Sequence, residues 1–347
     1  MNRLRNVITA LLLCGFGGGM ASCDKAQKAV DAAREKFRGV DPSAPVSPGG
    51  DVDSELASQV DSGAEGVRFR RDLPYPTDIN VRTVERTTYH EARAMSTSAL
   101  GTQTAPISGK FERIFSLKRA GTRLTLQIEK YGRMVEEEAA KETAKDPSKN
   151  KVVAAVDAAS EKEDEAKRLE GASIDFQLSN QGWRLPTTKG AADFTRMMWG
   201  KKLQPVMPSL LSHEGIMPRT QWFSSSRRWS GGDKLELTGD ALGLLFPGKC
   251  EGKVTLTYEV SEALDGHPCG RFAVSGDVSM KDVTDIDGVS STQEVSIRSG
   301  KVWCSLLYPL VLREEYDTVR TLAYGSDGAK TRIQGGWGVV SSRQWKP

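Results

Sequence analysis

Apolar and polar side chains alternate residue by residue along several stretches of this chain, and this pattern constrains the fold more than any other. The clearest stretch is residues 254–261, where four apolar side chains alternate with four polar ones. Alternation places one kind of side chain on each face of a strand, so that one face packs and the other meets water. The pattern predicts a mainly antiparallel β-sheet, either one curved sheet or two sheet lobes. The other expected strands are residues 111–117, 124–129, 174–179, 272–280, 295–312, 318–324 and 331–342.

Short turn sequences separate two pairs of these strands, which predicts two hairpins. Residues 119–122 contain Gly121 and separate the first pair. Residues 264–268, with the sequence Leu-Asp-Gly-His-Pro, separate 254–260 from 272–280. Arg113 interrupts the alternation of the first strand, because it falls on the same side as apolar neighbours.

Three cysteines, Cys250, Cys269 and Cys304, lie beyond the first two dozen residues. An odd number allows at most one disulfide and leaves a thiol. If the register follows the turn at 264–268, Cys269 lies opposite about Val260 and not opposite Cys250. The sequence therefore implies no particular bridge, and the pairing of the three cysteines stays open.

Two segments depart from the alternating pattern and predict helices. Residues 135–171 are rich in Ala, Glu and Lys and are interrupted by Asp-Pro-Ser-Lys-Asn at 146–150, which predicts a helical hairpin at about 135–170. Residues 191–211 carry apolar side chains at helical spacing, interrupted by Pro205 and Pro208. We expect short helices there that cover an apolar face of the sheet. The predicted fold class is α+β.

The N-terminus has the layout of an export signal. Two cations, Arg3 and Arg5, precede an apolar run at 7–13, and the signal ends in Met-Ala-Ser-Cys at 20–23. This tetrapeptide resembles the lipobox of bacterial lipoproteins. The resemblance implies that residues 1–22 are a signal peptide and that Cys23 is lipidated. The protein would then be exported and membrane-anchored through acyl chains such as palmitate, facing the periplasm or the cell exterior; inner or outer membrane stays open.

The segment after Cys23 is predicted to be a tether. Residues 39–50 are rich in Pro, Gly and Ser and contain few large apolar side chains, so they favour an extended spacer. The expected organisation is an anchor and flexible tether over 23–66 and a β-rich extracytoplasmic domain over 67–347. Acidic and basic residues nearly cancel, with a formal net charge of +3, which gives no electrostatic case for nucleic acid.

No motif in the sequence predicts an enzyme. Gly-Lys-Cys-Glu-Gly at 248–252 has the spacing of a nucleophile elbow, but an alternating strand follows where the elbow needs a helix. The histidines His90, His213 and His267 are far apart in sequence, with no ligand cluster around them.

Residues 283–294 resemble a calcium loop, with Asp285, Asp287 and Glu294 at ligand positions. The first ligand position holds Val283, and the flanks read as strands. We therefore predict neither a metal nor another cofactor.

Two features are candidates for ligand binding. The first is the pair Trp222 and Trp229, with Arg227 and Arg228 between them, because aromatic rings stack on ligands and arginines hold anions. The alternative is a strand with one tryptophan in the core. The second candidate is the methionine-rich segment that contains Met197, Met198 and Met207, because methionine adapts to variable apolar ligands.

Three functions remain open. The favoured one is a membrane-anchored binding or scaffold protein of the cell envelope. The second is a carrier or chaperone for a lipid or other apolar ligand, since half-open sheets covered by helices resemble lipid-binding lipoproteins of bacterial envelopes. The least favoured is an envelope hydrolase. The expected partners are the membrane, through the anchor, and an envelope protein or apolar ligand. A carrier would require an apolar cavity beneath 191–211.

Overall fold

The computed structural model describes residues 48–98, 101–134, 170–185, 200–284, 290–326 and 329–347. The N-terminal elements are the short helix α3 (Ser54–Ala57) and the strands β1 (Ser62–Gly63) and β2 (Gly66–Val67). The first run of long strands is β3 (Asp78–Ser98), β4 (Gly101–Ala120), β5 (Arg123–Met134), β6 (Ser173–Ser179) and β7 (Gly182–Arg184). Next come the 3-10 helix η2 (Gln204–Val206), the helix α8 (Met207–His213), β8 (Lys234–Thr238) and the 3-10 helix η3 (Gly239–Leu244). The chain ends with β9 (Lys249–Leu264), β10 (His267–Thr284), β11 (Ser290–Ser305), β12 (Val311–Ser326) and β13 (Ala329–Lys346).

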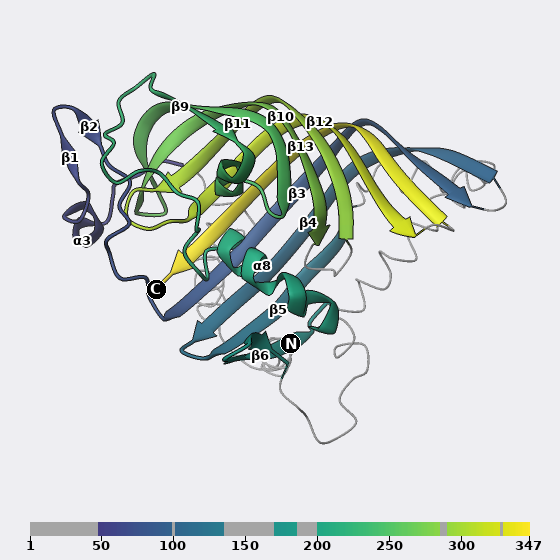
Figure 1. Cartoon of the computed structure of the whole chain (residues 1–347), viewed down its shortest axis with the longest axis horizontal. Coiled ribbons are helices and arrows are strands. Elements are labelled where there is room, and N and C mark those ends of the chain that lie inside the picture. Colours follow the sequence, from purple (N-terminus) through teal and green to yellow (C-terminus); the bar gives the residue numbers. More distant parts are fainter. Residues whose placement is uncertain (1–47, 99–100, 135–169, 186–199, 285–289, 327–328) are drawn as a thin grey trace, which may run out of the picture. The chain divides into compact units, whose positions relative to one another are not determined.

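The long strands form one 11-stranded antiparallel sheet in the order β7-β6-β5-β4-β3-β13-β12-β11-β10-β9-β8. Strands β3 to β7 form one meander, and strands β8 to β13 form another. The last strand, β13, pairs with the first long strand, β3, along its length, from Ala329 opposite Ser98 to Lys346 opposite Asn80. Figure 1 shows the strands bending so that one face of the sheet is concave, with α8 on that face.

The predicted class of a mainly antiparallel sheet is confirmed. Of the two arrangements left open, the structure has the single continuous sheet, because β13 joins the two meanders. The predicted helical hairpin at about 135–170 lies almost entirely outside the described residues. The short helices predicted over 191–211 are confirmed for the described part, as η2 and α8.

Both predicted hairpins form, as β4–β5 and β9–β10. The turn between β9 and β10 contains only Asp265 and Gly266, which both have positive φ, at 52° and 76°. Positive φ at both central residues is the requirement of a type I′ turn, and Asp-Gly is among its preferred sequences. The expected register was wrong by two residues, because this turn is tighter than a five-residue connection. Cys269 lies opposite Glu262.

Cys250 lies opposite Met280. Within the described residues Cys250, Cys269 and Cys304 are all free thiols.

The prediction of one continuous strand over 295–312 was also wrong. The structure ends β11 at Ser305, turns over residues 306–310 and begins β12 at Val311. No turn is predicted there from the residue pattern, because the turn contains the apolar residues Leu306, Leu307 and Leu310, which are all buried.

Two glycines allow β9 and β10 to approach closely where the sheet bends. Gly252 and Gly276 have φ of 126° and 132°. A Cβ on Gly276 would lie 2.2 Å from the carbonyl oxygen of Lys253, and one on Gly252 would lie 2.3 Å from that of Asp277. No other residue type fits these positions without moving the backbone.

Two apolar clusters pack on the sheet. The first lies over β8–β12, where η3 and two loops, one with Phe69 and the other with Phe223, cover it. The second lies over β3–β6, where Leu203, Met207 and Leu211 of the α8 region pack onto it. These three side chains are fully buried, so the sheet beneath α8 is filled by the protein's own core.

The described part of the segment predicted as a tether contacts the sheet. The backbone N–H of Gly49 donates to the carbonyl of Ala263 at 2.9 Å, and that of Asp53 donates to Gly266 at 2.9 Å. Val67 in β2 forms a bridge with Trp229. The chain divides into a unit over residues 1–44 and a unit over residues 45–347, so the described strands and helices all belong to the second unit.

Candidate functional site

A cavity with a volume of about 330 Å³ lies on the concave face of the sheet. Strands β3, β4, β5 and β10–β13 form its floor and walls, and residues 245–247 together with His213 at the end of α8 border it. It therefore lies beyond the end of α8. A carrier was expected to have its cavity beneath 191–211; the described part of that segment covers packed core instead.

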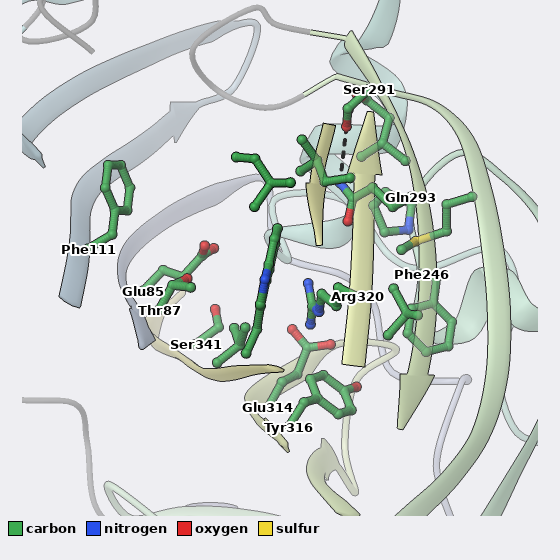
Figure 2. Close-up of a pocket in the computed structure, with 18 of the residues that line it drawn as sticks. Glu85, Thr87, Phe111, Phe246, Ser291, Gln293, Glu314, Tyr316, Arg320 and Ser341 are labelled. Carbon is green, nitrogen blue, oxygen red and sulfur yellow. Dashed lines mark hydrogen bonds between the residues drawn. The ribbon is translucent and has the colours of Figure 1, made fainter. Parts of the chain in front are cut away.

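Much of the cavity wall is apolar. Figure 2 shows Phe111 on one side of the cavity and Phe246 on the other. Further apolar lining residues are Ile107, Met280, Val283, Ile297, Leu322 and Ile333. They come from strands far apart in sequence, and alternation turns them all to the concave face.

The polar part of the cavity contains charges on core-facing positions. Glu85 of β3 lies directly opposite Arg113 of β4. One terminal nitrogen of Arg113 donates to both carboxylate oxygens of Glu85, each at 2.8 Å. Burial raises the pKa of Glu85, but the charge and hydrogen bonds of Arg113 outweigh this and hold the pKa below its ordinary value. Glu85 is therefore a carboxylate at neutral pH.

A second group of ions lies deeper, around Arg343 of β13. Arg343 donates to Glu214 at 3.0 Å and to Glu314 at 3.1 Å, and its side chain is only 2% exposed. Thr83 donates its hydroxyl to Glu214 at 2.7 Å. Burial lowers the pKa of Arg343, but the two carboxylates outweigh it and raise the pKa above its ordinary value. Removing one member of such a buried group would leave the others unpaired.

His213 and Arg219 complete this group. A terminal nitrogen of Arg219 lies 3.4 Å from Nδ1 of His213 and donates to the His213 carbonyl at 3.0 Å. Burial, and then the charges of Arg219 and Arg343, hold the pKa of His213 well below its ordinary value, so its ring is neutral at pH 7. Among the described residues, the carboxyl groups in and below the cavity are Glu85, Glu214 and Glu314, and the guanidinium groups are Arg113, Arg219, Arg320 and Arg343. Guanidinium groups outnumber carboxylates by one.

In the cavity lining, Tyr316 Oη, Trp337 Nε1 and Ser341 Oγ are buried without a hydrogen-bond partner among the described residues. Buried polar groups in proteins nearly always have a partner, and leaving one unpaired costs about 1–3 kcal/mol. Figure 2 shows Ser341 and Thr87 on the wall opposite Arg320. The cavity thus combines an apolar wall with unpaired polar groups, which is the usual lining of a small-molecule site.

The predicted tryptophan–arginine site lies elsewhere. Residues 222–228 form a loop and not the strand considered as the alternative. Both Trp222 and Trp229 are buried in the first apolar cluster, where the rings of Trp229 and Phe69 are 6.0 Å apart. The two tryptophans supply packing there.

Arg227 stacks on the ring of Trp229, 3.8 Å from its centroid, and Arg228 pairs with Asp61 at 2.7 Å. Of the predicted residues, these four do not line the cavity. Met197, Met198 and the lipidation candidate Cys23 lie outside the described residues. Met207, which belongs to the same predicted methionine segment, is buried in the second apolar cluster.

Of the remaining histidines, His267 has a defined partner. Its Nε2 lies 2.7 Å from the hydroxyl of Ser305. The Ser305 oxygen also accepts hydrogen bonds from the backbone N–H groups of Leu307 and Tyr308. Burial lowers the pKa of His267 to about 4, so the ring is neutral at pH 7. Because the Ser305 oxygen already accepts two N–H groups, its hydroxyl donates a hydrogen bond to Nε2 of His267. The pair is fully enclosed and fixes the turn between β11 and β12. His90 is exposed on β3.

Cys250 begins β9, and burial raises the pKa of its thiol to about 11. It is therefore a thiol at neutral pH, in keeping with the strand context that argued against a nucleophile elbow. In the described part of the chain no three His, Cys, Asp or Glu side chains lie close enough to hold a metal ion. The middle of the calcium-like segment, with Asp285 and Asp287, is outside the described residues.

The sequence pattern does not predict the cavity residues as a site, although charges on core-facing strand positions are a signal of it. Arg113 interrupts an otherwise apolar strand face, and Arg320 does the same in β12 between Tyr316 and Leu322. A charge on a core-facing strand position needs a buried partner. Such interruptions, read together, would have pointed to this cavity.

The chain matches no protein-family model and no curated protein sequence. Within the described residues, no helix has the length and hydropathy needed to cross a membrane.

Proposed function

We propose that this protein binds one small amphipathic or apolar molecule in the concave cavity and acts as a binding protein or carrier for it. The observation that carries the proposal is the combination, in one cavity, of an apolar wall and buried polar atoms (Tyr316 Oη, Trp337 Nε1 and Ser341 Oγ) that have no hydrogen-bond partner in the described part of the chain. A core made only for stability would fill the space and satisfy these atoms.

The proposal also places the protein in the cell envelope, anchored to a membrane through acyl chains on Cys23. Support comes from the export-signal layout and the Met-Ala-Ser-Cys sequence at 20–23. The proline- and glycine-rich segment at 39–50 would hold the binding unit away from the membrane surface.

The scaffold alternative has less support. It calls for an exposed apolar or charged patch, and the large apolar side chains exposed in the described part of the chain, Leu178, Val260 and Val319, come from three different strands. Scattered apolar residues of this kind are ordinary on protein surfaces. A hydrolase has less support. His267 and Ser305 are enclosed in the core, and His213, whose Nε2 lies 3.8 Å from Glu314 in the cavity wall, is a weak base because burial holds its pKa well below the ordinary value.

Ligand binding is tested by blocking the cavity. Leu322 of β12 lines the cavity, whereas Val319 of the same strand is 38% exposed and does not. The full-length protein is purified from cells, extracted with organic solvent, and the extract is examined by mass spectrometry. Wild type and the control Val319→Trp are expected to release the same amphipathic molecule, and Leu322→Trp to release much less. Equal yields from Leu322→Trp, or no bound molecule in any variant, would contradict the proposal.

The anchor is tested separately. Intact protein recovered from cell membranes is expected to lack residues 1–22 and to carry acyl mass on its first residue. Cys23→Ala is expected to lose the acyl mass and leave the membrane fraction. Wild-type protein that retains Met1 and has no acyl mass would refute the envelope location without bearing on the cavity.

A further inference from the structure

Among the described residues, each unpaired polar group that the cavity lining contributes can donate a hydrogen bond, although the hydroxyls of Tyr316 and Ser341 can also accept one. The indole Nε1 of Trp337 can only donate, and a guanidinium donates five N–H groups and accepts none. Arg320 uses its Nε to donate to the hydroxyl of Thr318 at 2.9 Å, and its guanidinium lies 5.5 Å from the centre of the Trp337 ring. Among the described residues, the terminal nitrogens of Arg320 make no hydrogen bond. A ligand that pairs with the donors of Trp337 and Arg320 must therefore carry oxygen atoms that accept hydrogen bonds.

The carboxylates near Arg320 are held by other arginines. Both oxygens of Glu85 accept hydrogen bonds from Arg113, and Glu314 accepts one from Arg343. Figure 2 shows Arg320 above Glu314 and below Gln293, with its guanidinium directed into the space between the walls. Within the described part of the chain, the terminal nitrogens of Arg320 therefore face the cavity without a hydrogen-bonding partner.

The charge balance favours a single negative charge. The arginines of the group outnumber its carboxylates by one, and His213 is neutral. Burial lowers the pKa of Arg320, but an arginine stays protonated at neutral pH. A neutral molecule would leave a net positive charge buried in a region of low dielectric, and a dianion would be repelled by Glu85 and Glu314.

The size of the cavity favours a single apolar chain. Its volume of about 330 Å³ lies at the lower end of ligand pockets, which range over roughly 300–1,000 Å³. The apolar residues Ile107, Phe111 and Ile333 line it together with Val283 and Met280. A planar carboxylate matches the two parallel N–H groups of a guanidinium better than a neutral oxygen does.

We infer that the ligand is a single-chain amphiphile with a carboxylate head group, which accepts hydrogen bonds from Arg320 and Trp337 while its chain lies against the apolar wall. This inference rests on the proposed function, since it names the class of ligand for the same cavity.

The test compares dodecanoic acid with dodecanol, which differ only in the head group, by calorimetric titration into delipidated full-length protein. Wild type is expected to bind the acid about tenfold or more tightly than the alcohol. A hydrogen bond to a charged group contributes at least as much free energy as a tenfold change in affinity requires. Arg320→Met is expected to lose this preference and to keep its affinity for dodecanol, which shows that its cavity is intact. Arg332→Met, at an exposed position on β13, is the matched control and is expected to behave as wild type.

Trp337→Phe removes one donor and keeps the aromatic ring. It is expected to weaken binding of the acid severalfold and to leave binding of the alcohol unchanged. Equal affinity of wild type for acid and alcohol would overturn the head-group inference and leave the proposed function standing. A preference for the acid that persists in Arg320→Met would also overturn it. Binding of neither probe by delipidated wild type would overturn the proposed function as well.

Discussion

At the scale of single residues, the concave face departs from the simple division into apolar inside and polar outside. Glu85, Arg113, Glu314 and Arg320 occupy strand positions that alternation assigns to the packed face. The neighbours of Arg113 and Glu314 on the same strand face are apolar or aromatic, so the local pattern shows these two charges as interruptions, whereas Glu85 lies between two threonines. Their partners come from other strands and become visible only in the folded chain.

His267 gives a prediction at this scale, because it is buried and neutral. Its pKa in the folded protein is about 4, below its ordinary value of 6.5. The unfolded chain takes up the proton first, so the stabilising contribution is complete above pH 6.5 and declines as the pH falls towards 4. Between pH 7.5 and pH 5 we expect wild type to lose about 2 kcal/mol more unfolding free energy than His267→Gln, which does not titrate.

Urea unfolding of both proteins at the two pH values measures this difference. The comparison cancels the contribution of the carboxylates, because they titrate in both proteins. One of them is Asp72, and its hydrogen bond with Arg70 lowers its pKa to about 2. If both proteins lost the same unfolding free energy over this pH range, His267 would not be the group that titrates.

At the scale of elements, many strands follow the alternating sequence pattern. The helix α8, in contrast, is not stable through its own sequence alone. α8 contains seven residues, which is too short for a helix to be stable in isolation. Pro208 lies in its first turn, where the missing N–H removes no helical bond. Met207 and Leu211 lie one turn apart and are both fully buried. Packing on the sheet therefore holds the helix in place.

Shortening a buried side chain of α8 tests whether packing on the sheet stabilises this helix. Leu211→Ala is expected to reduce the free energy of unfolding by about 2–5 kcal/mol, through lost burial and the cavity left behind. Ser209→Ala, at an exposed position of the same helix, is expected to change it by less than about 0.5 kcal/mol. Denaturant titration of both variants measures the effect. Similar small changes in both would mean that the helix contributes little to the fold.

At the scale of the whole sheet, the pairing of β13 with β3 makes one cooperative structure from two meanders. The two large apolar clusters lie on the same sheet, one over β8–β12 and one over β3–β6. Because backbone hydrogen bonds run without interruption from β7 to β8 through β13 and β3, neither cluster belongs to a separate lobe.

We therefore expect a single unfolding transition. Leu126→Ala removes a side chain from one cluster and Leu256→Ala from the other, and both residues are fully buried. Each variant is expected to move the whole transition to lower denaturant, with tryptophan fluorescence and far-ultraviolet circular dichroism coinciding. A transition that splits into two steps in either variant would instead indicate two independently folding halves.

The sequence by itself determined many of the strands, though not β3, and the hairpins closed by short turns, because the direction of a side chain along a strand and the conformation of an Asp-Gly turn are local properties. The sequence could not settle the register, the turn at 306–310 or the choice between one sheet and two lobes. Only the tertiary structure decided that β13 lies beside β3 and that Glu85, Arg113 and Arg320 share a cavity with Phe246. The pairing of β13 with β3 joins residues more than two hundred positions apart, and local periodicity does not show which distant strands will pair.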